Sequence, residues 1–146
     1  MASIYLAGRF ANKALLQDVR ADLQEAGHTV TSRWLDGDAA SETDSAYQDL
    51  EDIDRCDTLV LWADEPQPGE RPMQGALIEL GYAIALARLF GYHHKRIFIL
   101  DELKKRTVFF SMPQLHFIEN WQDLTEQLEV LEILGPGPVH WDLPLA

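Results

Sequence analysis

Short apolar segments alternate with longer segments of helical periodicity along the chain, and this alternation most constrains the fold. The short segments are rich in β-branched and aromatic residues and lie near residues 3–7, 28–34, 57–63, 95–100 and 115–118. The stretches between them repeat apolar residues every three or four positions, as amphipathic helices do. This order of strands and helices is typical of a parallel sheet covered by helices, so we expect an α/β protein.

Four helices are predicted around these strands. The first ends at Gly27, a good stop residue, and a shorter second helix surrounds Leu50–Asp54. The third closes at Gly91. The fourth runs from about Trp121 to Leu134, with Asn120 available as its cap.

The length of 146 residues predicts one domain, and 47% hydrophobic with 25% charged residues is a globular composition. We expect this domain to cover residues 1–134. Residues 135–146 are predicted to form a tail, because Gly135–Pro138 cannot continue a helix. Trp141 indicates that the tail packs on its own subunit or on a neighbouring one.

The chain is strongly acidic, with a formal net charge of -12 and no basic cluster longer than Lys104–Arg106. Its field opposes binding to a nucleic-acid polymer, so a nucleotide ligand should be small. Cys56 is the only cysteine, which excludes an internal disulfide and a CxxC site. The apolar run 76–90 is interrupted by charges and is too short to span a bilayer, and no signal-like segment precedes the first strand. We expect a cytoplasmic protein with no membrane partner.

Three segments that follow predicted strands stand out. The segment 35–43 is acidic and made of small residues, the segment 64–73 is rich in Pro and Gly, and Gly8–Phe10 forms the first turn. In open α/β sheets the loops beyond the carboxyl ends of the strands form the ligand crevice. The three segments should therefore converge at one site.

Glu79 is the only charge in the apolar helical run 74–87. Burying an ionised carboxylate without partners costs several kcal/mol or more, so its presence there requires an explanation. It lies in the first one or two turns of its helix, where free amides and the helix dipole favour the ionised form. Position alone leaves two interpretations, a nucleophile and a structural acid.

A second carboxylate is available in the acidic segment Tyr47–Asp57, although most of these acids are expected to be solvated. Two carboxylates that meet at a crevice are the equipment for cleaving a glycosidic bond. The acids from Asp36 to Asp44 lack the central glycine and the terminal glutamate of a calcium-binding loop, so we predict no metal.

The residues after the first two strands suggest a nucleotide-like ligand. Gly8 and Arg9 would present amides and a guanidinium to an anion such as phosphate. No complete GxGxxG or GxxxxGK[ST] motif is present, so dinucleotide binding is unsupported. Arg33 and Trp34 would stack on or hydrogen-bond a base, or Trp34 would belong to the edge of the core.

The order of several motifs resembles the nucleoside 2-deoxyribosyltransferase superfamily, which includes the 2′-deoxynucleoside 5′-phosphate N-hydrolases. The motifs are Ile4–Gly8, Asp49–Leu50 ahead of Asp57, and Glu79–Ala83. The run Gly27–Trp34 is similar to that of small phage and bacterial members. The resemblance covers most of the chain.

The resemblance implies a flavodoxin-like (Rossmann-like) three-layer sandwich with a five-stranded parallel sheet. It implies that Glu79 is the nucleophile, that Asp49 assists at the sugar and base, and that Tyr5 supports the nucleophile. Gly75 matches a small residue that lets the sugar approach the helix. It further implies at least a homodimer, in which a neighbouring subunit completes the active site.

Two departures from the family pattern concern the substrate. Relatives that bind a 5′-phosphate have a serine at the position of Met73, transferases have an aspartate there, and the first turn also differs. Arg9 is then the only obvious phosphate ligand. The predicted substrate-binding residues are Gly8, Arg9, Phe10, Arg33, Trp34, Asp64 and Gly75.

These residues predict an enzyme that cleaves an N-glycosidic bond. Glu79 would attack the anomeric carbon, and Asp49, with a pKa above that of Glu79, would manage the proton of the departing base. We expect a nucleoside or nucleotide and a free base as partners, transfer to a second base, and no cofactor. The alternatives are hydrolysis of deoxynucleoside 5′-monophosphates, a non-catalytic nucleotide-binding module, and, last, a phosphoacceptor domain built on Asp64.

Overall fold

The computed structural model describes residues 1–37 and 39–134, so the predicted tail 135–146 lies outside the described residues. Five parallel strands form one sheet in the order β2-β1-β3-β4-β5. They are β1 (Ser3–Ala7), β2 (Thr29–Val30), β3 (Thr58–Asp64), β4 (Arg96–Glu102) and β5 (His116–Ile118). This strand order is flavodoxin-like, and the predicted fold class is confirmed.

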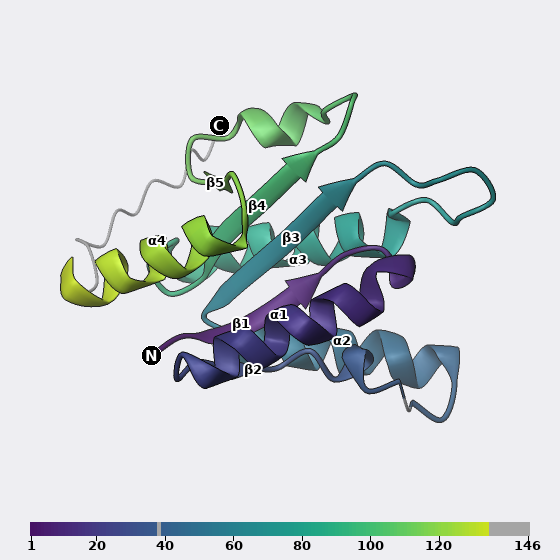
Figure 1. Ribbon diagram of the computed structural model, residues 1–146, viewed down its shortest axis with the longest axis horizontal. Helices are drawn as coiled ribbons and strands as arrows, with labels where there is room; N and C mark the ends of the chain where they lie inside the picture. Colours follow the sequence, from purple (N-terminus) through teal and green to yellow (C-terminus); the bar gives the residue numbers. More distant parts are fainter. Residues whose placement is uncertain (38, 135–146) are drawn as a thin grey trace.

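Helices cover both faces of the sheet and complete three layers (Figure 1). The helices are α1 (Lys13–Glu25), α2 (Glu42–Arg55), α3 (Gln74–Phe90) and α4 (Trp121–Leu134), with short 3-10 helices η1 (Phe10–Asn12), η2 (Arg33–Leu35) and η3 (Val108–Ser111). Helices α1 and α4 lie on one face, and α2 and α3 lie on the other. None of the helices within the described ranges has the length and apolarity needed to cross a membrane.

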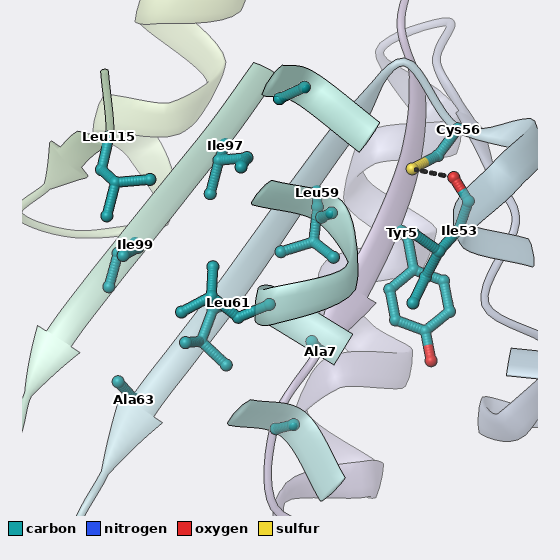
Figure 2. Close-up of a cluster of buried hydrophobic side chains, with 14 of the residues drawn as sticks. Tyr5, Ala7, Ile53, Cys56, Leu59, Leu61, Ala63, Ile97, Ile99 and Leu115 are labelled. Carbon is teal, nitrogen blue, oxygen red and sulfur yellow. Dashed lines mark hydrogen bonds between the residues drawn. The ribbon is translucent and has the colours of Figure 1, made fainter. Parts of the chain in front are cut away.

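Strand β1 shows how the sheet divides the core. Its side chains alternate between the faces, with Ile4 and Leu6 packed on the α1–α4 side and Tyr5 and Ala7 on the α2–α3 side. All four are fully buried, as expected for a parallel strand covered on both faces. Figure 2 shows the Tyr5 ring beside Ile53, with its hydroxyl directed toward the carboxyl ends of the strands.

Two predicted boundaries are wrong. The strand predicted over 28–34 pairs only at Thr29 and Val30. The Thr31 backbone N–H still donates to the Ile4 carbonyl, but at Ser32 the side-chain hydroxyl accepts from the β1 backbone in place of a main-chain carbonyl, and the 3-10 helix η2 begins at Arg33. The second helix is longer than predicted, because the Ser41 hydroxyl caps its start by accepting from a backbone N–H of the first turn.

The carboxyl end of α2 is held by a buried lysine. The Lys95 ammonium lies at the start of β4 and donates to the backbone carbonyls of Ile53, at 2.6 Å, and of Cys56. These carbonyls belong to the last turn of α2 and the residue after it, where the helix leaves its acceptors unpaired. Lys95 therefore ties α2 to the sheet.

Replacing Lys95 with methionine should lower the free energy of unfolding by about 2 kcal/mol, because buried carbonyls lose their donor. Urea unfolding followed by circular dichroism measures this loss. Lys105→Met, at an exposed position, is the matched control and should leave stability unchanged. Equal stability of the two variants would show that Lys95 does not hold the helix.

Candidate active site

The neighbouring strands β1 and β3 end at the topological switch point of the sheet. The chain leaves β1 toward β2 on one side and leaves β3 toward β4 on the other, which opens a crevice at their carboxyl ends. A pocket of about 570 Å³ lies there. Its lining contains residues from all three predicted segments: Gly8, Arg9, Phe10, Ala11, Trp34, Gly37, Ala39, Ser45, Gln48, Asp49, Glu70, Arg71, Pro72, Met73, Gly75, Ala76 and Glu79.

The Tyr5 hydroxyl donates a hydrogen bond to the Glu79 carboxyl. Tyr5 comes from the fully buried middle of β1, and Glu79 comes from α3. The bond joins the sheet to the helix at the edge of the pocket. Burial and the nearby Glu79 and Asp49 raise the pKa of Tyr5, so the phenol remains a donor.

The Glu79 carboxyl titrates far from its ordinary value. Its pKa rises from 4.5 to about 8, mainly because the carboxyl is buried; the Tyr5 hydrogen bond lowers the pKa and the nearby Asp49 raises it. Glu79 is the sixth residue of α3, beyond the four unpaired N–H groups at the start of the helix. The expectation that the start of the helix keeps this carboxyl ionised is therefore wrong, because burial outweighs it.

Asp49 lies on α2, half-buried, and lines the same pocket. Burial and the neighbouring Asp52 raise its pKa to about 6, while Arg33 lowers it. The predicted order of the two pKa values is reversed, because Glu79 is more deeply buried than Asp49. The two carboxyls form an interacting pair that holds one proton near neutral pH.

Arg9 is buried and already bound to two carboxylates. Its Nε and Nη2 donate to Asp64 at 2.7 and 2.8 Å, and its Nη1 donates to Glu70 at 2.6 Å. Burial alone would raise the pKa of Asp64, but its hydrogen bonds from Arg9 and Asn12 hold it below the usual range. Arg9 thus links the ends of β1 and β3 to the 64–73 loop, and it also lines the pocket. Its role as a phosphate ligand stays a prediction.

The other predicted substrate-binding residues divide into two groups. Gly8, Phe10, Trp34 and Gly75 line the pocket, whereas Arg33 and Asp64 are absent from its lining. The Trp34 indole donates to the Leu6 carbonyl at 2.8 Å, which fixes its ring at the pocket. A methyl group built on Gly75 would meet no atom within 4 Å, so the helix surface is open there.

Several lining residues were not predicted from the sequence. Ser45 and Gln48 lie on α2 with Asp49, and Ser45 precedes Gln48 by three residues and Asp49 by four, which places Ser45 beside both on the helix surface. This spacing is the sequence signal from which the two residues could have been predicted. Glu70 and Arg71 belong to the 64–73 loop and also line the pocket. No group of three or more His, Cys, Asp or Glu residues in the described ranges is arranged to hold a metal ion.

No protein-family model and no curated protein matches the sequence. Solved structures do match the fold. The CMP N-glycosidase of Clostridium botulinum is 19% identical, with a TM-score of 0.57 over 88% of this chain and 98% of the other. The protein has the fold of this enzyme.

Two 2-deoxyribosyltransferases share it as well. The enzyme of Bacillus psychrosaccharolyticus is 24% identical, with a TM-score of 0.57 over 85% of this chain and 90% of the other. The enzyme of Leishmania mexicana is 18% identical, with a TM-score of 0.56 over 98% and 92% of the two chains.

Replacing Glu79 with glutamine should stabilise the protein increasingly as the pH rises. The folded state holds a proton on Glu79 up to about pH 8, whereas the unfolded chain loses it near pH 4.5, so folding becomes less favourable between these values. Glutamine keeps the acceptor for Tyr5 and removes this cost.

The melting temperatures of the two proteins, compared by calorimetry from pH 5 to pH 9, test this. We expect nearly equal values at pH 5 and a gain of about 5 °C for the variant at pH 9, since one kcal/mol corresponds to several degrees in a domain of this size. A difference that stays constant with pH would contradict the burial of an ionisable Glu79.

Proposed function

We propose that the protein cleaves the N-glycosidic bond of a 2-deoxynucleoside through a covalent intermediate on Glu79 and transfers the sugar to another base. The observation that carries the proposal is the Tyr5–Glu79 hydrogen bond beside Asp49 in the switch-point pocket. Two interacting carboxyls at one crevice suit glycosidic chemistry. The fold shared with two 2-deoxyribosyltransferases and an N-glycosidase supports this choice.

In the first step, a Glu79 carboxylate oxygen attacks the anomeric carbon while the bond from that carbon to the base nitrogen breaks. The electron pair of the broken bond goes to the base, which receives a proton from Asp49. Tyr5 holds the attacked carboxyl in place through its hydrogen bond. A 2-deoxy sugar lacks the hydroxyl that would destabilise the oxocarbenium-like transition state, so a carboxylate suffices.

The proton of the carboxyl pair must be on Asp49 when Glu79 attacks. The proton favours Glu79, whose pKa of about 8 exceeds that of Asp49, about 6, because Glu79 is more deeply buried. The productive arrangement is then the less populated of the two. Positive charge that develops on the sugar favours an ionised Glu79 and therefore draws the proton toward Asp49 and the base.

In the second step, a nitrogen of the incoming base attacks the anomeric carbon, Asp49 accepts its proton, and Glu79 departs as a carboxylate. Both bases would occupy the part of the pocket lined by Trp34, Ser45 and Gln48. The Trp34 ring offers a stacking surface, and the α2 side chains offer hydrogen bonds to a base edge. Water attack at the same carbon would give an N-glycosidase instead.

We propose a nucleoside rather than a nucleotide as the substrate. The described lining residues include two cations, Arg9 and Arg71, and three acids, Asp49, Glu70 and Glu79. The Arg9 guanidinium is already occupied by carboxylates, and the whole chain carries a net charge of -12. A phosphate would enter an unfavourable field, with Arg71 at the exposed rim as its remaining cation.

Incubation of the protein with deoxycytidine or deoxyadenosine and a different free base should produce the new nucleoside. Chromatography detects it and separates transfer from hydrolysis, which releases free sugar. We expect Glu79→Gln to lower turnover at least about 10³-fold while the circular dichroism spectrum is kept. Near-normal turnover in the folded variant would exclude Glu79 as the nucleophile, and faster turnover of the 5′-monophosphates would favour the hydrolase alternative.

The pH dependence of kcat/KM should be bell-shaped, with a maximum near pH 7. Below about pH 6 both carboxyls are protonated and the nucleophile is lost; above about pH 8 both are ionised and the proton donor is lost. Initial rates between pH 4.5 and 9.5 measure both limbs. A flat profile across this range would contradict a shared proton on the pair.

We also propose a homodimer that forms through α3. The outward face of this helix exposes Ile78 at 70% and Leu89 at 62%, with Gly81 and Ala85 between them. Most surface helices are amphipathic, whereas α3 is apolar around most of its circumference. On a chain with a net charge of -12, a face without acidic residues is the surface on which two copies repel each other least.

Replacing Ile78 with glutamate should convert the dimer to a monomer, because each copy would bury an unpaired charge against the other. Light scattering after size-exclusion chromatography measures the mass. Val130→Glu, an exposed apolar position on α4, is the control and should stay dimeric. A wild-type protein that is monomeric at micromolar concentration would contradict the proposal.

A further inference from the structure

A buried carboxylate outside the pocket joins α2 to η2. Asp52 is only 1% exposed, and its carboxylate accepts hydrogen bonds from the Arg33 backbone N–H, at 2.9 Å, and from Arg33 Nε, at 2.7 Å. Its backbone carbonyl accepts from the Thr31 hydroxyl at 2.9 Å. The Arg33 guanidinium also reaches Glu51 at 3.1 Å. Two consecutive residues of α2 are therefore held by one arginine.

These contacts lie next to the residues that line the pocket. Asp49 precedes Asp52 by three positions, so the two carboxyls lie on neighbouring parts of one helix face. Arg33 directly precedes Trp34, whose indole is bound to the Leu6 carbonyl of β1. The Arg33–Asp52 pair therefore connects the helix that carries Asp49 to the segment that carries Trp34.

We propose that Arg33 and Asp52 form a clamp that holds Asp49 in position relative to Glu79 and Trp34. They are positioning residues, and Arg33 does not bind the substrate. This inference rests on the proposed role of Asp49 as the acid. It is supported by the absence of Arg33 from the pocket lining and by the two-point contact of its guanidinium and backbone with one carboxylate.

The Arg33–Asp52 clamp also affects the pKa of Asp49 through its charges. The charged groups that shift the pKa of Asp49 are Asp52 of α2 and Arg33 of η2, and Asp49 in turn raises the pKa of Tyr5 of β1 and of Glu79 of α3. Burial and Asp52 raise the pKa of Asp49, and Arg33 lowers it. Removing either partner of the clamp should therefore shift the titration of Asp49, in opposite directions.

A carbon-13 NMR titration of the Asp49 carboxyl in the whole protein tests the clamp without any need for turnover. We expect Arg33→Ala to move the midpoint upward and Asp52→Asn to move it downward, each by about half a pH unit or more. The double variant should return toward the wild-type midpoint. Glu51→Gln, which removes the exposed ion pairs of Glu51 with Arg33 and Arg55 and keeps the Arg33–Asp52 contact, is the control and should leave the midpoint in place.

Kinetics with a deoxynucleoside then separate positioning from binding. We expect Arg33→Ala to lower kcat about tenfold, to change KM less than threefold, and to move the acidic limb of the pH profile with the Asp49 midpoint. A raised KM with kcat retained would overturn the clamp and return Arg33 to substrate binding. If Asp52→Asn does not fold, the Asp49 midpoint and the kinetics of Arg33→Ala test the clamp by themselves. This variant is expected to fold, because Arg33 is 44% exposed and its loss leaves no cavity.

The two proposals can fail separately. If no deoxynucleoside is turned over, the proposed function fails, while opposite shifts of the Asp49 midpoint would still support the clamp. If turnover is observed and the midpoint is the same in the wild type, Arg33→Ala and Asp52→Asn, the clamp fails and the proposed function stands.

Discussion

A carboxyl group buried against the Tyr5 hydroxyl is the interaction on which the rest of the site depends. Removing a carboxylate from water is costly, and here the cost appears as a raised pKa of Glu79 rather than as an ion pair. The bond requires Tyr5 of the central strand β1 and Glu79 of the helix α3 to lie at the same level along the strand direction. The apolar packing of β1 and α3 supplies that alignment.

The sheet order explains why the groups of the proposed active site come from distant segments. Because β1 and β3 are neighbours while their connections run in opposite directions, the loops after both strands open on the same crevice. The ion pair between Arg9 and Asp64 joins these two strand ends, and Glu70 adds the 64–73 loop to them. Arg9, which the sequence suggested as a phosphate ligand, thus holds together the segments on one side of the pocket.

Much of the fold could be predicted from apolar periodicity, because burial on both sheet faces leaves a clear pattern in strands such as β1. The start of α4 could be predicted from Asn120, whose side chain accepts from the Asp123 backbone N–H. The convergence of three loops followed from the parallel order. Side-chain hydrogen bonds leave no such pattern, so the early end of β2 at Val30 was missed. The reversed order of the Glu79 and Asp49 pKa values depends on depth of burial, which no local motif encodes.

In the proposed mechanism, Glu79 forms a covalent bond to the sugar. Saturating deoxynucleoside without an acceptor base, followed by rapid acid quenching, proteolysis and mass spectrometry, tests it most directly. We expect one pentosyl adduct on the peptide that contains Glu79, together with products that retain the anomeric configuration. An adduct on another residue, or products of inverted configuration without an adduct, would contradict it.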